Sequence, residues 1–179
     1  IVIFDPHGDY LGLYKNQDKI KNKLGQNVKA KLFFPKVKTS EDDFEFYLRS
    51  LIDKLGQHLT APQEDAFGDV LNSYDYVEGR SMGEHLTELI RLLQTRIDNA
   101  QDARTRPTLG AIRRALRLVN AQIERMENAN ENLRNRLGDK YKFDEMPNPF
   151  ADGEKIVRQN QISIFYLGGY DLLTQSTII

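Results

Sequence analysis

The strongest constraint on the fold is an apolar repeat in the second half of the chain. From Leu109 to Leu137 the apolar residues follow one another at alternating steps of three and four positions, with Asn130 as the one polar member. This spacing places them along one side of an α-helix about 45 Å long. The repeat consists of Leu109, Ile112, Leu116, Val119, Ile123, Met126, Asn130, Leu133 and Leu137. Asn130 either sets the register or partner number of the helix, or marks the place where its packing frays.

Three shorter helices are predicted ahead of this one. They begin at the capping residues Ser40, Thr60 and Ser81, and each carries apolar residues at a spacing of three to four positions. Gly79 is expected to end the second of them. Residues 40–138 are therefore predicted to form an all-helical block, in which the helices pack on the long one.

Strand patterns lie on both sides of this block. Residues 1–4 are consecutive apolar residues, which is the pattern of a strand covered on both faces. The segment "VKAKLFFP" alternates and ends at Pro35, which predicts a second strand. A short helix over Asp18–Leu24 is predicted between them, because Gly25 can end it.

The last part of the chain returns to strand. The segment "QISIFYLGGYD" predicts a third strand that ends at Gly168 and Gly169, and a helix is predicted to begin at Leu172. The fold class is therefore α/β, with a large all-α insertion. The predicted organisation is a core segment at 1–39, the helical block at 40–138, an acidic proline-containing connector at 139–160, and a return to the core at 161–179.

Composition narrows the class of protein. The chain has 179 residues, enough for one domain or for one domain with a large insertion. It has no cysteine, which excludes disulfides and thiolate metal sites and is typical of a cytoplasmic protein. Its net charge of −1 gives no argument for or against a nucleic-acid partner. No apolar run reaches about 18 residues, so no membrane partner is expected.

Both ends of the sequence are apolar. The chain begins at Ile1 rather than at a Met, inside a strand pattern, and it ends on Ile178 and Ile179. Because chain termini are usually polar and frayed, we expect an internal piece of a longer protein. The alternative is a chain trimmed at a true domain edge.

A cluster of acid and imidazole groups follows the first strand. Asp5, His7 and Asp9 lie at the end of this strand, where the ligand-binding groups of parallel sheets gather. The carboxylates can hold or orient a magnesium-bound water, and the imidazole can donate to a phosphate oxygen. Asp, Pro and Gly are also ordinary turn residues, so a turn with no further role is the alternative interpretation.

The segment "IVIFDPHGDYLGL" resembles the one that follows the phosphate-loop helix in HerA-type ATPases of the HerA/FtsK superfamily. Every position of that family's Asp-Pro-His-Gly-acid-Tyr motif is filled from Asp5 to Tyr10, although the family more often has Glu where Asp9 stands. The segment "ISIFYLGGYD" resembles a later strand of the same core, which ends in a small-residue turn. The family's phosphate loop and its main metal-binding acid fall outside this sequence, in which no Gly-x-x-x-x-Gly-Lys-Ser/Thr string occurs.

This resemblance implies a partial parallel sheet of a RecA-like P-loop ATPase core that carries a helical insertion. It also implies an ATP-driven, ring-forming DNA translocase or helicase, with ATP and Mg²⁺ as cofactors of the full-length protein. The implied partners are further copies in a homo-oligomeric ring, expected to be a hexamer, together with duplex DNA and a nuclease or other effector protein. Because the phosphate loop is missing, the isolated chain is expected to bind no cofactor and not to hydrolyse ATP.

The resemblance also assigns roles to individual residues. Asp5, His7 and Asp9 would lie near the γ-phosphate and the magnesium ion, and Gly8, Gly168 and Gly169 would lie near the nucleotide. Tyr166 and Tyr170 flank the glycine pair and either line this site or pack in the core.

An arginine cluster lies at the start of the long helix. Residues 104–117 contain five Arg and no acid, and such a density of charge can bind phosphates. The candidate nucleic-acid contacts are Arg106, Arg113, Arg114 and Arg117. The alternative is a solvated face, or a set of ion pairs with the acidic segment at 40–46, because the cluster has no interleaved aromatic residues for base stacking.

A second hypothesis comes from a different class of protein. The helical block can act as an interaction or oligomerisation module through Leu109–Leu137, without a catalytic role. A third possibility is a scaffold that only spaces the core strands. His58 and His85 have no metal-ligand spacing to other His or acid residues, so both are expected to be surface or capping residues.

Overall fold

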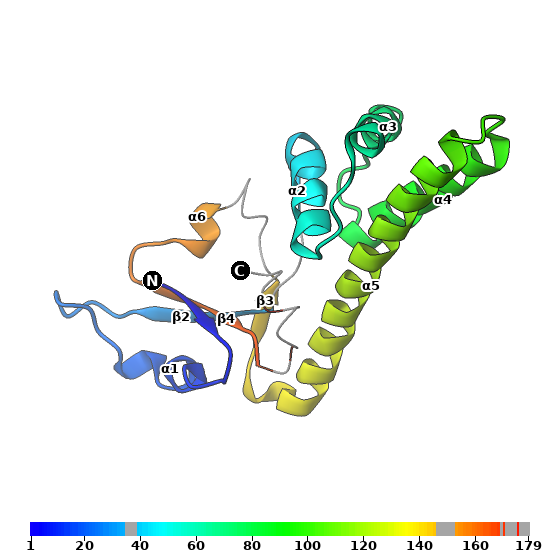
Figure 1. The fold of residues 1–179 in the computed structure, drawn as a ribbon. Helices are drawn as coiled ribbons and strands as arrows, with labels where there is room; N and C mark the ends of the chain where they lie inside the picture. The colour runs from blue at the N-terminus through cyan, green and yellow to red at the C-terminus, as the bar shows by residue number, and fades with distance from the viewer. Residues whose placement is uncertain (35–38, 146–152, 169, 171–174, 176–179) are drawn as a thin grey trace. The chain divides into compact units, whose positions relative to one another are not determined.

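The computed structural model describes residues 1–34, 39–145, 153–168, 170 and 175 (Figure 1). The chain divides into two compact units, which are described separately. Unit 1 consists of Ile1–Lys38 and Arg125–Ile179, and unit 2 consists of Thr39–Glu124. The border between Glu124 and Arg125 falls inside the helix α5 (Thr105–Leu137), so both units contain part of this helix.

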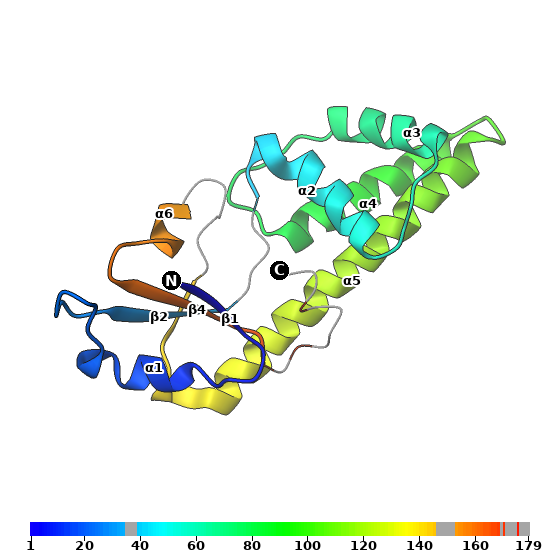
Figure 2. The same cartoon turned by 60° about the vertical axis from the view of Figure 1, so that its left-hand side comes forward.

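Unit 1 is built on a parallel sheet, which confirms the α/β class. Its strands are β1 (Val2–Asp5), β2 (Lys29–Phe34), β3 (Phe143–Glu145) and β4 (Gln161–Tyr166). Their order in the sheet is β1-β4-β2-β3, and every neighbouring pair is parallel. The strand β4 therefore lies between β1 and β2, and Figure 2 labels these three strands. The three strands predicted from the sequence are therefore confirmed, although the first begins one residue later.

The central strand β4 is buried along its whole length, including the polar residues Gln161 and Ser163. The Gln161 side-chain amide donates to the Ile156 carbonyl at 3.2 Å, and the Ser163 hydroxyl donates to the same carbonyl at 2.6 Å. Ile156 is the last residue of the short helix α6 (Gly153–Ile156). The Ile156 side chain packs with Phe33 and Phe165. These bonds fix α6 on one face of the sheet.

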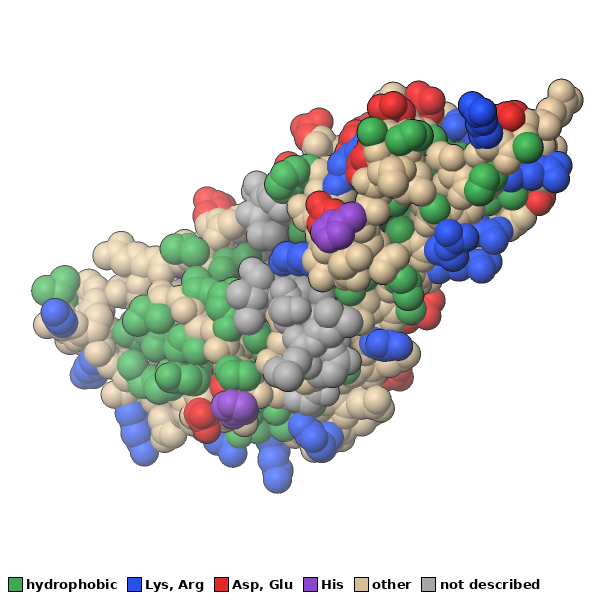
Figure 3. All heavy atoms as spheres, viewed as in Figure 1, with side chains coloured by type: hydrophobic (Ala, Val, Ile, Leu, Met, Phe, Trp, Pro, Cys, Tyr) green, Lys and Arg blue, Asp and Glu red, His purple; other side chains and the backbone are tan. Residues whose placement is uncertain are grey.

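The strand β1 is only partly covered by described residues. Val2 is 37% exposed and Phe4 is 43% exposed, on the face where Phe4 stacks against Phe165 with 5.4 Å between ring centroids. The prediction of a strand covered on both faces is therefore wrong for the described residues, because the face that carries Val2 and Phe4 is left partly exposed. Figure 3 shows hydrophobic side chains gathered on this part of unit 1.

The segment predicted as a connector contains structure of its own. It holds the 3-10 turn η2 (Gly138–Lys140), the strand β3 and the helix α6. The Phe143 ring stacks on the Phe34 ring with 3.9 Å between centroids. Because β3 has only three residues, its stability comes from pairing with β2 rather than from a sequence pattern.

The predicted helix at 18–24 is wrong. The structure has a short helix α1 (Leu11–Lys15) and a 3-10 turn η1 (Gln17–Lys19), followed by a tight turn. In that turn the Asn22 side-chain oxygen accepts from the backbone N–H of Leu24 and Gln26, at 2.8 and 3.0 Å. An Asn side chain that binds nearby backbone groups competes with a helix, which explains the difference.

Unit 2 contains the predicted helices. They are α2 (Glu41–Lys54), α3 (Ala61–Asn72), α4 (Met82–Asn99) and the first part of α5. Ser40, Thr60 and Ser81 occupy the N-cap positions, and the last two form capping boxes with Gln63 and Glu84. The helix α3 ends at Asn72, earlier than the predicted end at Gly79. None of the described helices is both long and apolar enough to cross a membrane.

The repeat on α5 is confirmed as the buried side of the helix. The members from Leu109 to Met126 are at most 6% exposed. Asn130 is half-buried and accepts a hydrogen bond from the Tyr170 hydroxyl, within unit 1. This polar member of the repeat therefore binds a side chain that lies 40 residues further along the chain. The helix predicted from Leu172 lies outside the described residues.

His85 is buried, so the prediction of a surface or capping residue is wrong for it, whereas His58 is exposed as predicted. The His85 ring stacks on Tyr76 with 4.4 Å between centroids, and its Nδ1 lies 2.6 Å from the Tyr74 hydroxyl. The burial of His85 has little signal in the sequence, because its partners Tyr74 and Tyr76 follow α3 in a loop and contact α4 only through tertiary packing.

We expect unit 2 to lose stability in mild acid because of His85. Burial, followed by the charge of Arg80, lowers the pKa of His85 below its ordinary value of about 6.5. The folded state therefore keeps a neutral imidazole while the unfolded chain gains a proton, and stability falls as the pH drops through about 6.5. Urea unfolding at pH 7.5 and at pH 5.5 measures this fall.

The substitution His85→Phe should reduce the pH dependence, because a phenyl ring fits among Tyr74, Tyr76 and Phe44 and does not titrate. The exposed His58→Gln variant serves as the control and should keep the full dependence. An unchanged pH dependence in His85→Phe would show that other groups cause it.

Candidate functional site

The candidate site lies at the carboxyl ends of β1 and β4. These strands are parallel neighbours, and Asp5, the last residue of β1, pairs with Tyr166, the last residue of β4. The turns that follow the two strands therefore start at the same edge of the sheet, which is the edge where parallel sheets bind ligands.

Asp5 organises the turn after β1. Its side chain is fully buried, and Oδ1 accepts from the backbone N–H of Gly8 at 2.8 Å and of Asp9 at 3.1 Å. Its Oδ2 accepts from the backbone N–H of Tyr10 at 3.1 Å. Both carboxylate oxygens thus hold the backbone of residues 8–10 in one conformation. The predicted turn is present, and Asp5 supports it from inside.

His7 and Asp9 face solvent, whereas the Asp5 side chain is buried. Both are exposed, and they stand on the turn that Asp5 holds. Exposed imidazole and carboxylate groups on a fixed backbone can donate to, and accept from, a ligand without a large loss of conformational entropy. Among the described residues there is no group of three or more His, Cys, Asp or Glu side chains that could hold a metal ion.

Gly8 and Gly168 both lie against the ring of Tyr166. Gly8 has a φ of +86°, and a Cβ added there would lie 3.2 Å from Tyr166 Cε2. A Cβ added to Gly168 would lie 2.6 Å from the Tyr166 hydroxyl oxygen and 2.7 Å from Cζ. The absence of side chains at both positions therefore makes room for Tyr166, which is 5% exposed. Gly169 lies outside the described residues.

The two tyrosines that flank the glycine pair are packed. Tyr166 lies 6.1 Å from Phe143 between ring centroids, and Tyr170 is 7% exposed. Burial raises the pKa of Tyr170, so its hydroxyl stays protonated and donates to Asn130. Of the two interpretations of these tyrosines, packing is the one that their burial supports.

The candidate arginines on α5 fall in different environments. Arg106, Arg114 and Arg117 are exposed, whereas Arg113 is half-buried and its Nε has no hydrogen-bond partner among the described residues. Arg106 donates to the Ala100 carbonyl at 3.0 Å. Within the part of the chain that the structure describes, none of these arginines pairs with the acidic segment at 40–46. The ion-pair alternative therefore has no support there.

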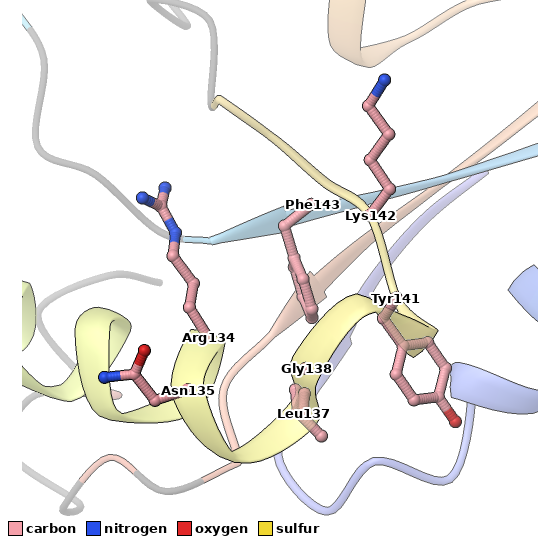
Figure 4. A pocket seen from close by; sticks show the side chains of 7 residues that line it. All are labelled: Arg134, Asn135, Leu137, Gly138, Tyr141, Lys142 and Phe143. Atoms are coloured by element: carbon pink, nitrogen blue, oxygen red, sulfur yellow. The ribbon is translucent and has the colours of Figure 1, made fainter.

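A second basic cluster was not identified from the sequence. The segment "RNRLGDKYKF" at 134–143 alternates cations with aromatic residues, and this pattern is the signal that could have identified it. The structure folds the segment around a pocket of about 580 Å³ at the end of α5 (Figure 4). It is separate from the turn after β1, because none of the residues that line it belongs to that turn.

The comparisons with known proteins give one match. A family model described as "Helicase HerA, central domain" matches residues 1–179, and so covers every residue of the chain. No curated protein and no solved structure matches it.

Proposed function

The chain belongs to the family of HerA helicase central domains, and from this membership we propose that it is part of an ATP-driven, ring-forming DNA translocase. In this proposal the parallel sheet of unit 1 is part of a RecA-like P-loop core. The turn after β1 forms one wall of the ATP site, and the isolated chain does not hydrolyse ATP.

The observation that carries the proposal is the way in which Asp5 holds the turn. Three backbone N–H groups bind its buried carboxylate, so His7 and Asp9 are presented at the ligand-binding edge of the sheet on a fixed backbone. A phosphate oxygen can accept a hydrogen bond from the exposed His7 imidazole. Such fixed groups are what phosphoryl transfer requires, since its catalysis consists mainly of positioning and charge stabilisation.

The described residues suit an indirect contact with Mg²⁺. Protein-bound magnesium usually keeps several waters and takes one or two carboxylates besides the phosphates. Asp9 offers one exposed carboxylate, whereas the Asp5 oxygens already accept backbone bonds. We therefore assign Asp9 to a magnesium-bound water and Asp5 to support of the turn. When bound, the metal would neutralise charge that develops on the phosphates.

Duplex DNA is the proposed substrate of the translocase. Arg106, Arg114 and Arg117 are exposed on α5 and are the proposed phosphate contacts in unit 2, together with Arg113, whose Nε lacks a described partner. Binding through these residues should weaken steeply as salt rises, because each neutralised phosphate releases counterions.

The test is ATP turnover. We expect no magnesium-dependent phosphate release by the 179-residue chain alone. In the full-length gene product that contains this chain, His7→Ala and Asp9→Asn should each lower kcat about tenfold, because each removes one contact to the phosphates or to a bound water.

The matched control is Asp18→Asn, which removes an exposed carboxylate from η1 in the same unit and should leave kcat unchanged. The proposal fails if both site variants turn over ATP at the rate of the unmodified protein. It also fails if the isolated chain hydrolyses ATP.

A further inference from the structure

The pocket at the carboxyl end of α5 gathers an excess of positive charge. Its lining includes the cations Arg134 and Lys142, and an adjoining hollow of about 720 Å³ is lined by Lys15, Arg136 and Lys140 among others. The two hollows share Leu137, Gly138 and Tyr141. All of these residues belong to unit 1.

These cations lack acidic partners among the described side chains. Arg134, Arg136, Lys140, Lys142 and Lys15 are all exposed, and none of the described ion pairs includes them. Of the acids nearby in sequence, Asp144 pairs with Lys31 at 3.2 Å, and none of the described ion pairs joins Glu131 to these cations. Among the described side chains, the two hollows therefore carry positive charge that an anionic ligand would offset.

Stabilisation of the end of α5 does not account for all of this charge. The carboxyl end of a helix carries about half a negative charge, which one or two nearby cations offset. Arg134 and Arg136 lie in the last turn and fill that role. Lys140, Lys142 and Lys15 lie beyond the helix or on α1, so the end of α5 does not offset their charge.

Aromatic rings lie against two of these cations. The Arg134 guanidinium lies over the Phe34 ring, 5.3 Å from its centroid, and Lys15 Nζ lies 4.9 Å from the centroid of Tyr141. Figure 4 shows Arg134 and Lys142 extending to the same side of the pocket, on either side of Phe143. Cations fixed in this way lose less entropy when they bind a ligand.

We propose that this pocket binds the phosphate groups of a polyphosphate ligand. Phosphate fits better than carboxylate because each phosphate group carries up to about two charges and three acceptor oxygens, which can satisfy several cations at once. The Arg134 guanidinium can bind a phosphate through two parallel hydrogen bonds, while Lys142 acts as a point charge. The Asn135 amide, which also lines the pocket, can donate to the same ligand.

The test is calorimetric titration of the 179-residue chain with inorganic tripolyphosphate at low salt. We expect one bound tripolyphosphate per chain, and at least about tenfold weaker binding in the double variant Arg134→Gln/Lys142→Gln. The matched control is Lys19→Gln/Lys23→Gln, which removes two exposed charges from the same unit outside both hollows and should change the affinity less than about twofold.

Circular dichroism spectra verify that both double variants keep their helices. Equal weakening in the two double variants would show a diffuse charge effect and overturn the proposal, as would the absence of any binding. Competition then identifies the source of the phosphates. Displacement by ATP assigns a nucleotide, displacement by a twelve-residue oligothymidylate assigns a nucleic-acid strand, and displacement by neither assigns a free polyphosphate; each of these supports the pocket.

Discussion

Replacement of Asp5 by Ala is expected to lower the free energy of unfolding of unit 1 by about 3 kcal/mol. The side chain is fully buried, and its loss leaves the backbone N–H groups of Gly8, Asp9 and Tyr10 without their acceptor. An unpaired buried donor costs about 1 to 3 kcal/mol, and partial access of water to this turn reduces the sum. Urea unfolding followed by far-ultraviolet circular dichroism measures the effect.

Two further variants separate this role from a general effect of charge. Asp5→Asn keeps the size of the side chain but has only one acceptor oxygen, so its NH₂ group faces a backbone N–H donor. The loss of unfolding free energy in Asp5→Asn should therefore exceed half of the loss in Asp5→Ala. Asp9→Ala removes an exposed carboxylate from the same turn and should change the unfolding free energy by less than about 0.5 kcal/mol. Similar losses in Asp5→Ala and Asp9→Ala would contradict the assigned role of Asp5.

Replacement of Gly168 by Ala is expected to destabilise unit 1 by about 2 to 3 kcal/mol. The new Cβ would lie 2.6 to 2.9 Å from three atoms of the Tyr166 side chain, closer than non-bonded atoms approach. Tyr166 is almost fully buried, so its ring can make room only by displacing its neighbours. The same urea experiment measures the loss.

A double-mutant cycle with Tyr166→Ala isolates the clash. In the Tyr166→Ala background, Gly168→Ala should cost less than about 0.5 kcal/mol, because the atoms that it meets are gone. Gly12→Ala is the control for the substitution itself. Gly12 lies in α1, and no atom beyond its chain neighbours and its own helix backbone lies within 4 Å of the added Cβ, so the change should be neutral or slightly stabilising. Equal losses in both backgrounds would rule out Tyr166 as the cause.

Helices and strands were predictable where they follow from a local or repeated sequence pattern. The long helix from Thr105 to Leu137 follows from a repeat that only one periodicity can satisfy. The starts of α3 and α4 follow from Thr60 and Ser81, because a capping residue acts on backbone groups within three positions. The strand β4 follows from its apolar run, although that run does not identify the roles of Gln161 and Ser163.

Features that depend on distant partners were not predictable. The strand β3 is held by pairing with β2 and by the Phe34–Phe143 stack, and three residues carry no period. The burial of His85 results from contacts with Tyr74 and Tyr76, which belong to a loop. At the candidate site, the residue types at Asp5, His7 and Asp9 were identified from the sequence. The division of roles, with Asp5 inside and the other two exposed, required the structure.

The ring of Tyr166 has a mechanical consequence. Gly8 and Gly168 both lie against the Cε2 edge and the hydroxyl of this ring, so a shift of either turn toward the ring would push the same side chain. The room that each turn has therefore depends on where the other one holds Tyr166. The phenol ring thus couples the positions of the two turns within unit 1.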